Sequence, residues 1–69
     1  MQSLGIIDEI GQCKTALTTN QLGEYLNISP KTVFQWTKQG RIPVIRLGSS
    51  VRFDPKVTAA WLRARSTDA

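Results

Sequence analysis

Polar and apolar positions in the middle of the chain predict a short helix between Thr18 and Asn27. The residues from Thr18 to Gln21 have the spacing of a capping box, in which each end side chain bonds a free backbone amide of the other. The apolar residues that follow at helical spacing are Leu22, Tyr25 and Leu26. Asn27 tolerates the left-handed conformation that ends many helices. The pattern therefore predicts a helix of about two turns.

A second short helix is predicted directly afterwards, over residues 30–39. Ser29 is a favourable cap for the first free amides, and Pro30 suits the first helical position because it has no amide hydrogen. The residues that line one face are Val33, Trp36 and Thr37. Gly40 ends this helix, and Pro43 prevents its continuation.

Two β-prone segments follow, residues 44–47 and 51–53, with turn-forming residues 48–50 between them. We therefore expect a β-hairpin over residues 44–53. Because side chains alternate across a strand, the odd-numbered positions place four apolar residues on one face and the even-numbered positions place two arginines on the other. The apolar set is Ile45, Leu47, Val51 and Phe53, and the arginines are Arg46 and Arg52. The two arginines are expected to lie near each other across the strands, where they repel unless an anion separates them.

The last predicted helix begins after Asp54-Pro55, which repeats the sequence of a capping residue followed by proline. Its apolar stripe is expected to face inward and consists of Val57, Ala60, Trp61 and Ala64. Trp36 and Trp61 both fall on inward stripes, so we expect them to be core residues on facing helices rather than a stacking platform.

The N-terminal extension, residues 1–16, is weakly patterned. Leu4, Ile7 and Ile10 lie three residues apart, and Gly11 is a suitable helix end. We expect a disordered tail or one loosely docked turn of helix, and the alternative is a self-association or partner-binding segment. The expected folded domain is 17–65, followed by a loose tail over 66–69.

Together these elements predict a small mainly-α domain with a β-hairpin: a winged helix-turn-helix, with a two-stranded wing and a C-terminal helix. The three-residue turn 27–29 is too short for a crossover, so the first two helices must pack at a steep angle. Gly23 supplies the small residue that this crossing needs. The alternative interpretation is a generic helical hairpin with no role in DNA binding.

Composition limits the function classes. The 69 residues and 7.7 kDa amount to one small domain, which has little room for a substrate cleft. The absence of histidine removes the usual general base, and the single cysteine, Cys13, allows no internal disulfide and no zinc site of the cysteine–histidine kind. We therefore expect no enzyme activity, cofactor, metal or small-molecule substrate, an incidental Cys13, no membrane association and a cytoplasmic location.

Positive charge is concentrated in one part of the chain. The net charge is +4, but the segment from Ser29 to Phe53 has five basic residues and no acidic residue. These are Lys31, Lys38, Arg41, Arg46 and Arg52. Such a basic surface suits a polyanion, and the alternative is a solvated basic face without a ligand.

Residues 17–65 resemble the excisionase-type DNA-binding domains, close relatives of the MerR-like winged helices. The matching positions are Leu17-Thr18, Leu22, Leu26, Ile28-Ser29, Thr32-Val33, Trp36, Gly40, Ile42-Pro43, Arg46, Gly48, Arg52-Phe53, Val57 and Trp61-Leu62. The resemblance implies sequence-specific binding of double-stranded DNA by an excisionase or a small transcriptional regulator of a phage or mobile element. Its expected partners are a recombinase or further copies of the chain on tandem sites. The alternative is a protein-interaction module that keeps the fold without DNA contacts.

This chain departs from the family pattern at two positions. The family often has alanine where Gly23 stands, a change expected to be harmless. Arginines commonly follow the glycine at its wing tip, whereas Ser49 and Ser50 stand here, so the grip of this wing on phosphate is in question.

The outward face of helix 30–39 is the predicted reading surface, because a recognition helix contacts bases from its N-terminal half. Gln35 suits adenine, and Lys31 suits guanine or a phosphate. Thr32 suits a thymine methyl or helix capping, and Ser29 suits a phosphate at the helix start. Lys38 and Arg41 are predicted to contact the DNA backbone. The other predicted DNA-binding residues lie on the wing and are Arg46, Ser49, Ser50 and Arg52. Arg52 and the tip 48–50 are expected to enter or flank the minor groove. Phe34 is expected to pack along the DNA backbone, against the wing or on the domain.

Overall fold

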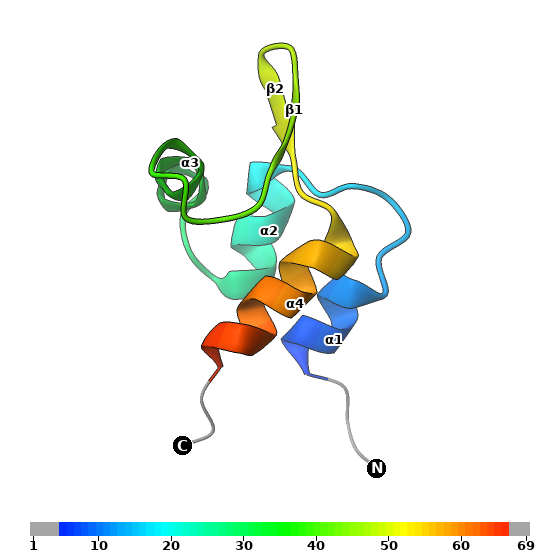
Figure 1. Cartoon of the computed structure of the whole chain (residues 1–69). Coiled ribbons are helices and arrows are strands. Elements are labelled where there is room, and N and C mark those ends of the chain that lie inside the picture. Colours follow the sequence, from blue (N-terminus) through cyan, green and yellow to red (C-terminus); the bar gives the residue numbers. More distant parts are fainter. Residues whose placement is uncertain (1–4, 67–69) are drawn as a thin grey trace.

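The computed structural model of the chain describes residues 5–66, which form four helices and one antiparallel hairpin (Figure 1). The elements are α1 (Ile6–Gly11), α2 (Thr19–Leu26), α3 (Pro30–Lys38), β1 (Ile45–Leu47), β2 (Ser50–Arg52) and α4 (Pro55–Arg65). This order of helix, turn, helix, hairpin and helix confirms the predicted winged helix-turn-helix. Leu4 and most of the predicted tail 66–69 lie outside the described residues.

The local signals around α2 act as the sequence predicts. The Thr18 hydroxyl accepts from the Gln21 amide at 3.0 Å, and the Gln21 side-chain oxygen accepts from the Thr18 amide at 3.0 Å. Asn27 follows the last residue of α2 in the left-handed conformation, with φ of 57°. These local bonds fix where α2 begins and ends.

The start of α3 and its crossing with α2 follow from Ser29, Pro30 and Gly23. Ser29 accepts from the Thr32 amide at 3.2 Å, and Pro30 is the first helical residue. Gly23 is buried, and a Cβ built on it would lie 2.7 Å from the carbonyl oxygen of Ile28. Alanine at this position therefore requires the turn backbone to move, which differs from the harmless change that the family resemblance implies.

The hairpin register corrects the predicted faces of the wing. Leu47 pairs with Ser50, so the turn contains only Gly48 and Ser49, and Gly48 has a positive φ of 63°. Directly paired residues share one face of a sheet, and Arg46 pairs with Val51 while Arg52 pairs with Ile45. The predicted parity assumed a three-residue turn, and a turn one residue shorter puts Arg46 and Arg52 on opposite faces.

The inward face of α4 also differs from the prediction. Val57 is 47% exposed, and Ala60 and Ala64 are exposed, whereas Thr58 and Ala59 are buried. The cause is α1, which packs along α4 (Figure 1). A Cβ added to Gly11 would lie 3.3 Å from that of Ala59, so this side of α4 faces α1. Of the predicted stripe only Trp61 is half-buried, and it packs against the core together with the half-buried Leu62.

The helix α1 is more than a loosely docked turn. Ile10 is fully buried in the core, and the Asp8 carboxylate accepts from Arg63 of α4 at 2.8 Å. The described part of the N-terminal extension therefore contributes to the folded domain.

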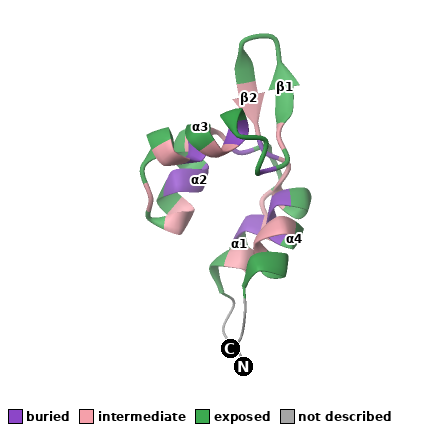
Figure 2. Ribbon diagram, turned by 60° about the vertical axis from the view of Figure 1, so that its left-hand side comes forward, coloured by how far each residue is buried: buried purple, intermediate pink, exposed green. Residues whose placement is uncertain are grey.

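One core holds the elements together, as the burial colours of Figure 2 show. Its buried apolar residues are Ile10, Leu17, Leu22, Val33, Ile42, Phe53 and Ala59. An isolated antiparallel bridge between Leu17 and Phe53 joins the end of the hairpin to the segment before α2. Trp36 and Trp61 pack against this core and against each other, but both are half-buried at its edge rather than core residues as predicted. Within the described residues, no helix is long and apolar enough to cross a membrane.

Candidate nucleic-acid interface

The outer face of α3 is polar and basic. Lys31, Gln35 and Lys38 are exposed on it, while Val33 and Thr37 are buried on the opposite side. Among the described residues, the Gln35 side chain has no hydrogen-bond partner within the domain. Its amide is therefore free to donate and to accept at once, which a bidentate contact to a base edge needs.

The start of α3 is already largely satisfied by its own cap. The Ser29 side chain accepts from the Thr32 amide, and the Ser29 and Thr32 hydroxyls lie 3.2 Å apart. The Val33 amide donates to the Ser29 carbonyl. Thr32 is half-buried and serves the cap, which is one of its two predicted roles. The donors still available to a phosphate at this helix start are the backbone amide and the side-chain ammonium group of Lys31.

Phe34 is exposed on α3 rather than buried in the domain. Its side chain is 43% exposed, and the Lys38 ammonium lies 5.3 Å from the centre of its ring. The four-residue spacing places the two side chains one helical turn apart, within the range of a cation–π contact. Phe34 and Lys38 therefore present one amphipathic surface in the second half of α3.

The hairpin contributes two arginines with different surroundings. Arg46 donates from Nη2 to the carbonyl oxygen of Thr37 in α3, at 3.3 Å. Arg52 is half-buried on the other face and donates from Nη1 to the Val51 carbonyl at 2.7 Å. Ser49 and Ser50 are exposed at the tip, next to Gly48. The structure therefore does not bring Arg46 and Arg52 together as the sequence analysis expected.

The acidic residues that the structure describes lie outside α3 and the hairpin in the chain, although Asp54 shares a surface pocket with Ile45 of β1 and Glu24 shares one with Ser29. Asp8 bonds Arg63, and Asp54 caps α4 by accepting from the amides of Lys56 and Val57. The electrostatic asymmetry of the sequence is thus retained in the fold, with a basic surface on α3 and the hairpin.

A second cluster of cations lies between α3 and α4, and sequence reasoning identified only its member Arg41. Arg65 is stacked on Trp61, with 4.0 Å between its guanidinium carbon and the ring centre. Trp61 packs against Trp36 with 5.8 Å between ring centres and 51° between planes. Arg41 lines the same cleft. Arg65 could have been found from its four-residue spacing to Trp61 in a predicted helix.

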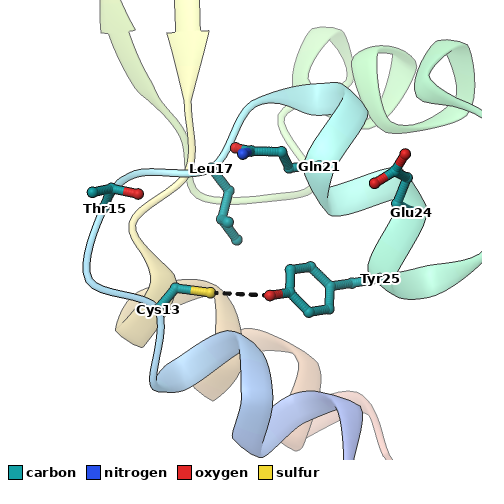
Figure 3. Close-up of a pocket in the computed structure, with 6 residues that line it drawn as sticks. All are labelled: Cys13, Thr15, Leu17, Gln21, Glu24 and Tyr25. Atoms are coloured by element: carbon teal, nitrogen blue, oxygen red, sulfur yellow. Dashed lines mark hydrogen bonds between the residues drawn. The ribbon is translucent and has the colours of Figure 1, made fainter.

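A separate pocket of about 420 Å³ lies between the end of α1 and α2 (Figure 3). In it the Cys13 sulfur lies 3.3 Å from the Tyr25 hydroxyl. This hydrogen bond, together with the charge of an ionised Cys13, raises the pKa of Tyr25 above its ordinary value of 10.0. Among residues 5–66 no group of three or more histidine, cysteine, aspartate or glutamate residues could hold a metal ion.

Comparison with known protein families gives a match. A family model described as a helix-turn-helix domain matches residues 16–66, which is well over half of the chain. No curated protein and no solved structure matches. Domains of this kind point to DNA binding and are typically non-enzymatic.

Proposed function

This chain belongs to the helix-turn-helix domain family, and from that premise we propose that it binds double-stranded DNA in a sequence-specific manner. In the proposal α3 enters the major groove, and the hairpin 44–53 lies along the minor groove or the backbone. The observation that carries this proposal is the outer face of α3, where Gln35 stands free between two lysines in a segment without acidic residues.

The proposed base contacts come from the outer face of α3. Gln35 pairs bidentately with adenine through the two ends of its amide, and Lys31 reaches a guanine or the adjacent phosphate. Thr32 adds at most a methyl contact, because its hydroxyl bonds Ser29. Phe34 packs along the sugar-phosphate backbone through its exposed ring. These contacts assign specificity to a few base pairs.

The proposed phosphate contacts surround that centre and determine affinity rather than sequence preference. They are Ser29 with the start of α3, Lys38, Arg41, Ser49, Ser50 and Arg52. Arg46 contributes mainly through its bond to α3, since one edge of its guanidinium is already engaged there.

The proposed biological role is that of an excisionase or a small transcriptional regulator of a phage or mobile element, acting at the nucleoid in the cytoplasm. The family resemblance and the single small reading helix support it. A domain of 69 residues covers few base pairs, so copies on tandem sites, or a recombinase bound alongside, are the expected partners.

Selection of this protein against a random pool of duplex DNA, at roughly physiological salt, tests the proposal. We expect a short enriched motif, and its repeat spacing would reveal tandem binding. Retention without enrichment, with affinity vanishing as salt rises, would limit the function to non-specific binding. No retention at any salt would overturn the proposal in favour of the protein-interaction module, for which residues 1–16 or the exposed Phe34 would be the candidate surface.

A further inference from the structure

The cleft between the ends of α3 and α4 has the composition of an anion site. It measures about 500 Å³ and is lined by Trp36, Arg41, Trp61, Leu62 and Arg65. No acidic residue that the structure describes lies in this lining. Two arginines therefore line one concave surface, and no acidic residue in the described lining neutralises them.

We propose that this cleft binds a DNA phosphate through Arg41 and Arg65, outside the site that α3 reads. The inference rests on the proposed function and adds a contact at the end of α4, where the sequence analysis placed none. The ligand is a phosphodiester group, whose oxygens can accept from the paired N–H donors of a planar guanidinium.

Stacking prepares Arg65 for this contact. Its guanidinium carbon lies 4.0 Å from the Trp61 ring centre, so the indole limits the freedom of a side chain that would otherwise be mobile. Stacking occupies a face of the guanidinium and leaves its N–H edge free to bond oxygen. Among the described residues Arg65 has no hydrogen-bond or ion-pair partner.

The neighbouring Arg63 shows what a cation with a structural role looks like on the same helix. Its Nη2 donates to the Asp8 carboxylate at 2.8 Å and joins α4 to α1. Arg63 and Arg65 carry the same charge in the last turn of α4, but only Arg65 lines the cleft. They form a matched pair for an experiment.

The position of the cleft suits a backbone contact. In the view of Figure 1, α3 lies to the left, the hairpin rises to its upper right, and the C-terminal end of α4 lies below α3. Arg41 follows α3 directly, and its backbone amide donates to the Trp36 carbonyl at 2.9 Å. With α3 in the major groove and the hairpin on one flank, the cleft lies toward the sugar-phosphate backbone on the other flank.

Salt dependence of DNA binding tests the proposal with Arg65→Gln and Arg63→Gln. We expect Arg65→Gln to lower the slope of log affinity against log salt by about 0.9, the value for one lost phosphate contact. Arg63→Gln, which removes the same charge, should leave the slope near that of the unchanged protein. Circular dichroism should show both variants folded. Equal slopes for Arg65→Gln and Arg63→Gln would overturn the proposal.

Binding to duplexes of different length is a second test of the cleft assignment. On a duplex trimmed to the bases that α3 covers, Arg65→Gln and the unchanged protein should bind alike, and they should differ on a duplex extended away from the hairpin. If the unchanged protein binds no duplex, the proposed function fails. If it binds and the extension makes no difference, only the cleft assignment fails.

Intrinsic fluorescence reports on the cleft directly, because both tryptophans of the chain line it. Extended duplex should change the indole emission of the unchanged protein, and trimmed duplex should change it less. Inorganic phosphate is the probe for the alternative ligand, a free phosphate ion that the same two arginines could bind. A full emission change with inorganic phosphate and none with extended duplex would rule out a DNA phosphate as the ligand.

Discussion

The Arg46 guanidinium on β1 donates from Nη2 to the Thr37 carbonyl oxygen in the last turn of α3, over 3.3 Å. Carbonyl groups at the end of a helix carry partial negative charge, so a cation is favourable there. The bond joins the hairpin, which projects from the body of the domain in Figure 1, to the helix proposed to read bases. It sets the distance between the two DNA-contacting elements of the proposal.

Replacing Arg46 should therefore loosen the hairpin more than it reduces phosphate binding. For Arg46→Met we expect faster backbone motion at Gly48 and Ser49 in ¹⁵N relaxation, weaker DNA binding and a nearly unchanged salt slope. Arg52→Met should instead lower the salt slope by about 0.9 while the tip stays ordered. A slope for Arg46→Met as low as that for Arg52→Met would show that Arg46 itself contacts phosphate.

Gln35 is expected to determine one base position. Gln35→Ala should reduce discrimination there by about 1–3 kcal/mol, because the bidentate contact to adenine is lost. Repeating the selection from random duplex with the variant measures this effect position by position. Lys38→Ala is the control, and it should weaken all sequences alike. Uniform weakening by Gln35→Ala would contradict its assignment as a base reader.

Gly23 should tolerate no larger side chain. Gly23→Val is expected to lower the free energy of unfolding by about 1–3 kcal/mol, the usual cost of overpacking, because its Cβ meets the Ile28 carbonyl. Helix propensity does not account for such a loss, since valine is no worse than glycine in a helix. Ala60→Val, at an exposed position of α4, serves as the control for urea denaturation. Unchanged stability of Gly23→Val would mean that α2 and α3 shift apart freely.

Thr58 carries a buried hydroxyl for which the described part of the chain provides no hydrogen-bond partner. Thr58→Val keeps the branched shape and removes the unpaired polar group, so we expect a gain in stability of about 1 kcal/mol. Thr37→Val is the matched control, because the Thr37 hydroxyl is buried but donates to the Phe34 carbonyl at 2.6 Å. That variant should lose stability in thermal denaturation. A loss for Thr58→Val as well would indicate a bond that the Thr58 hydroxyl makes in solution.

The Cys13–Tyr25 contact should be visible in alkaline titration. Since the folded pKa of Tyr25 lies above 10.0, its contribution to stability is complete below pH 10.0 and is lost as the pH rises through the raised value. Cys13→Ala removes the main causes and should return the pKa of Tyr25 toward 10.0. Tyrosinate absorbance measures it without overlap, because Tyr25 is the chain's single tyrosine. Thr15→Ala, in the same pocket, should leave the pKa unchanged, and an unchanged value in Cys13→Ala would refute the contact.

The limits of α2 and α3 could be predicted because their causes are local. Thr18 and Gln21 bond each other across three residues, and Ser29 bonds the amide of Thr32. Such contacts depend on spacing along the chain and on backbone preferences, both of which are present in the sequence. The same holds for the exposed position of Gln35, which follows from helical periodicity once Val33 is placed inside.

The faces of the hairpin and of α4 could not be predicted in this way, because they depend on distant partners or on one residue of turn length. The two-residue turn of Gly48 and Ser49 puts Arg46 and Arg52 on opposite faces of the hairpin. Because α1 packs against Ala59, the buried face of α4 is not the apolar stripe that the sequence predicted. Arg65 and Arg41 line one cleft because Trp61, on which Arg65 stacks, packs against Trp36. The sequence by itself determined the order of elements, their caps and the basic character of α3 and the hairpin. The tertiary structure decided which side chains meet, because the packing of the core selects one register and one rotation for each element.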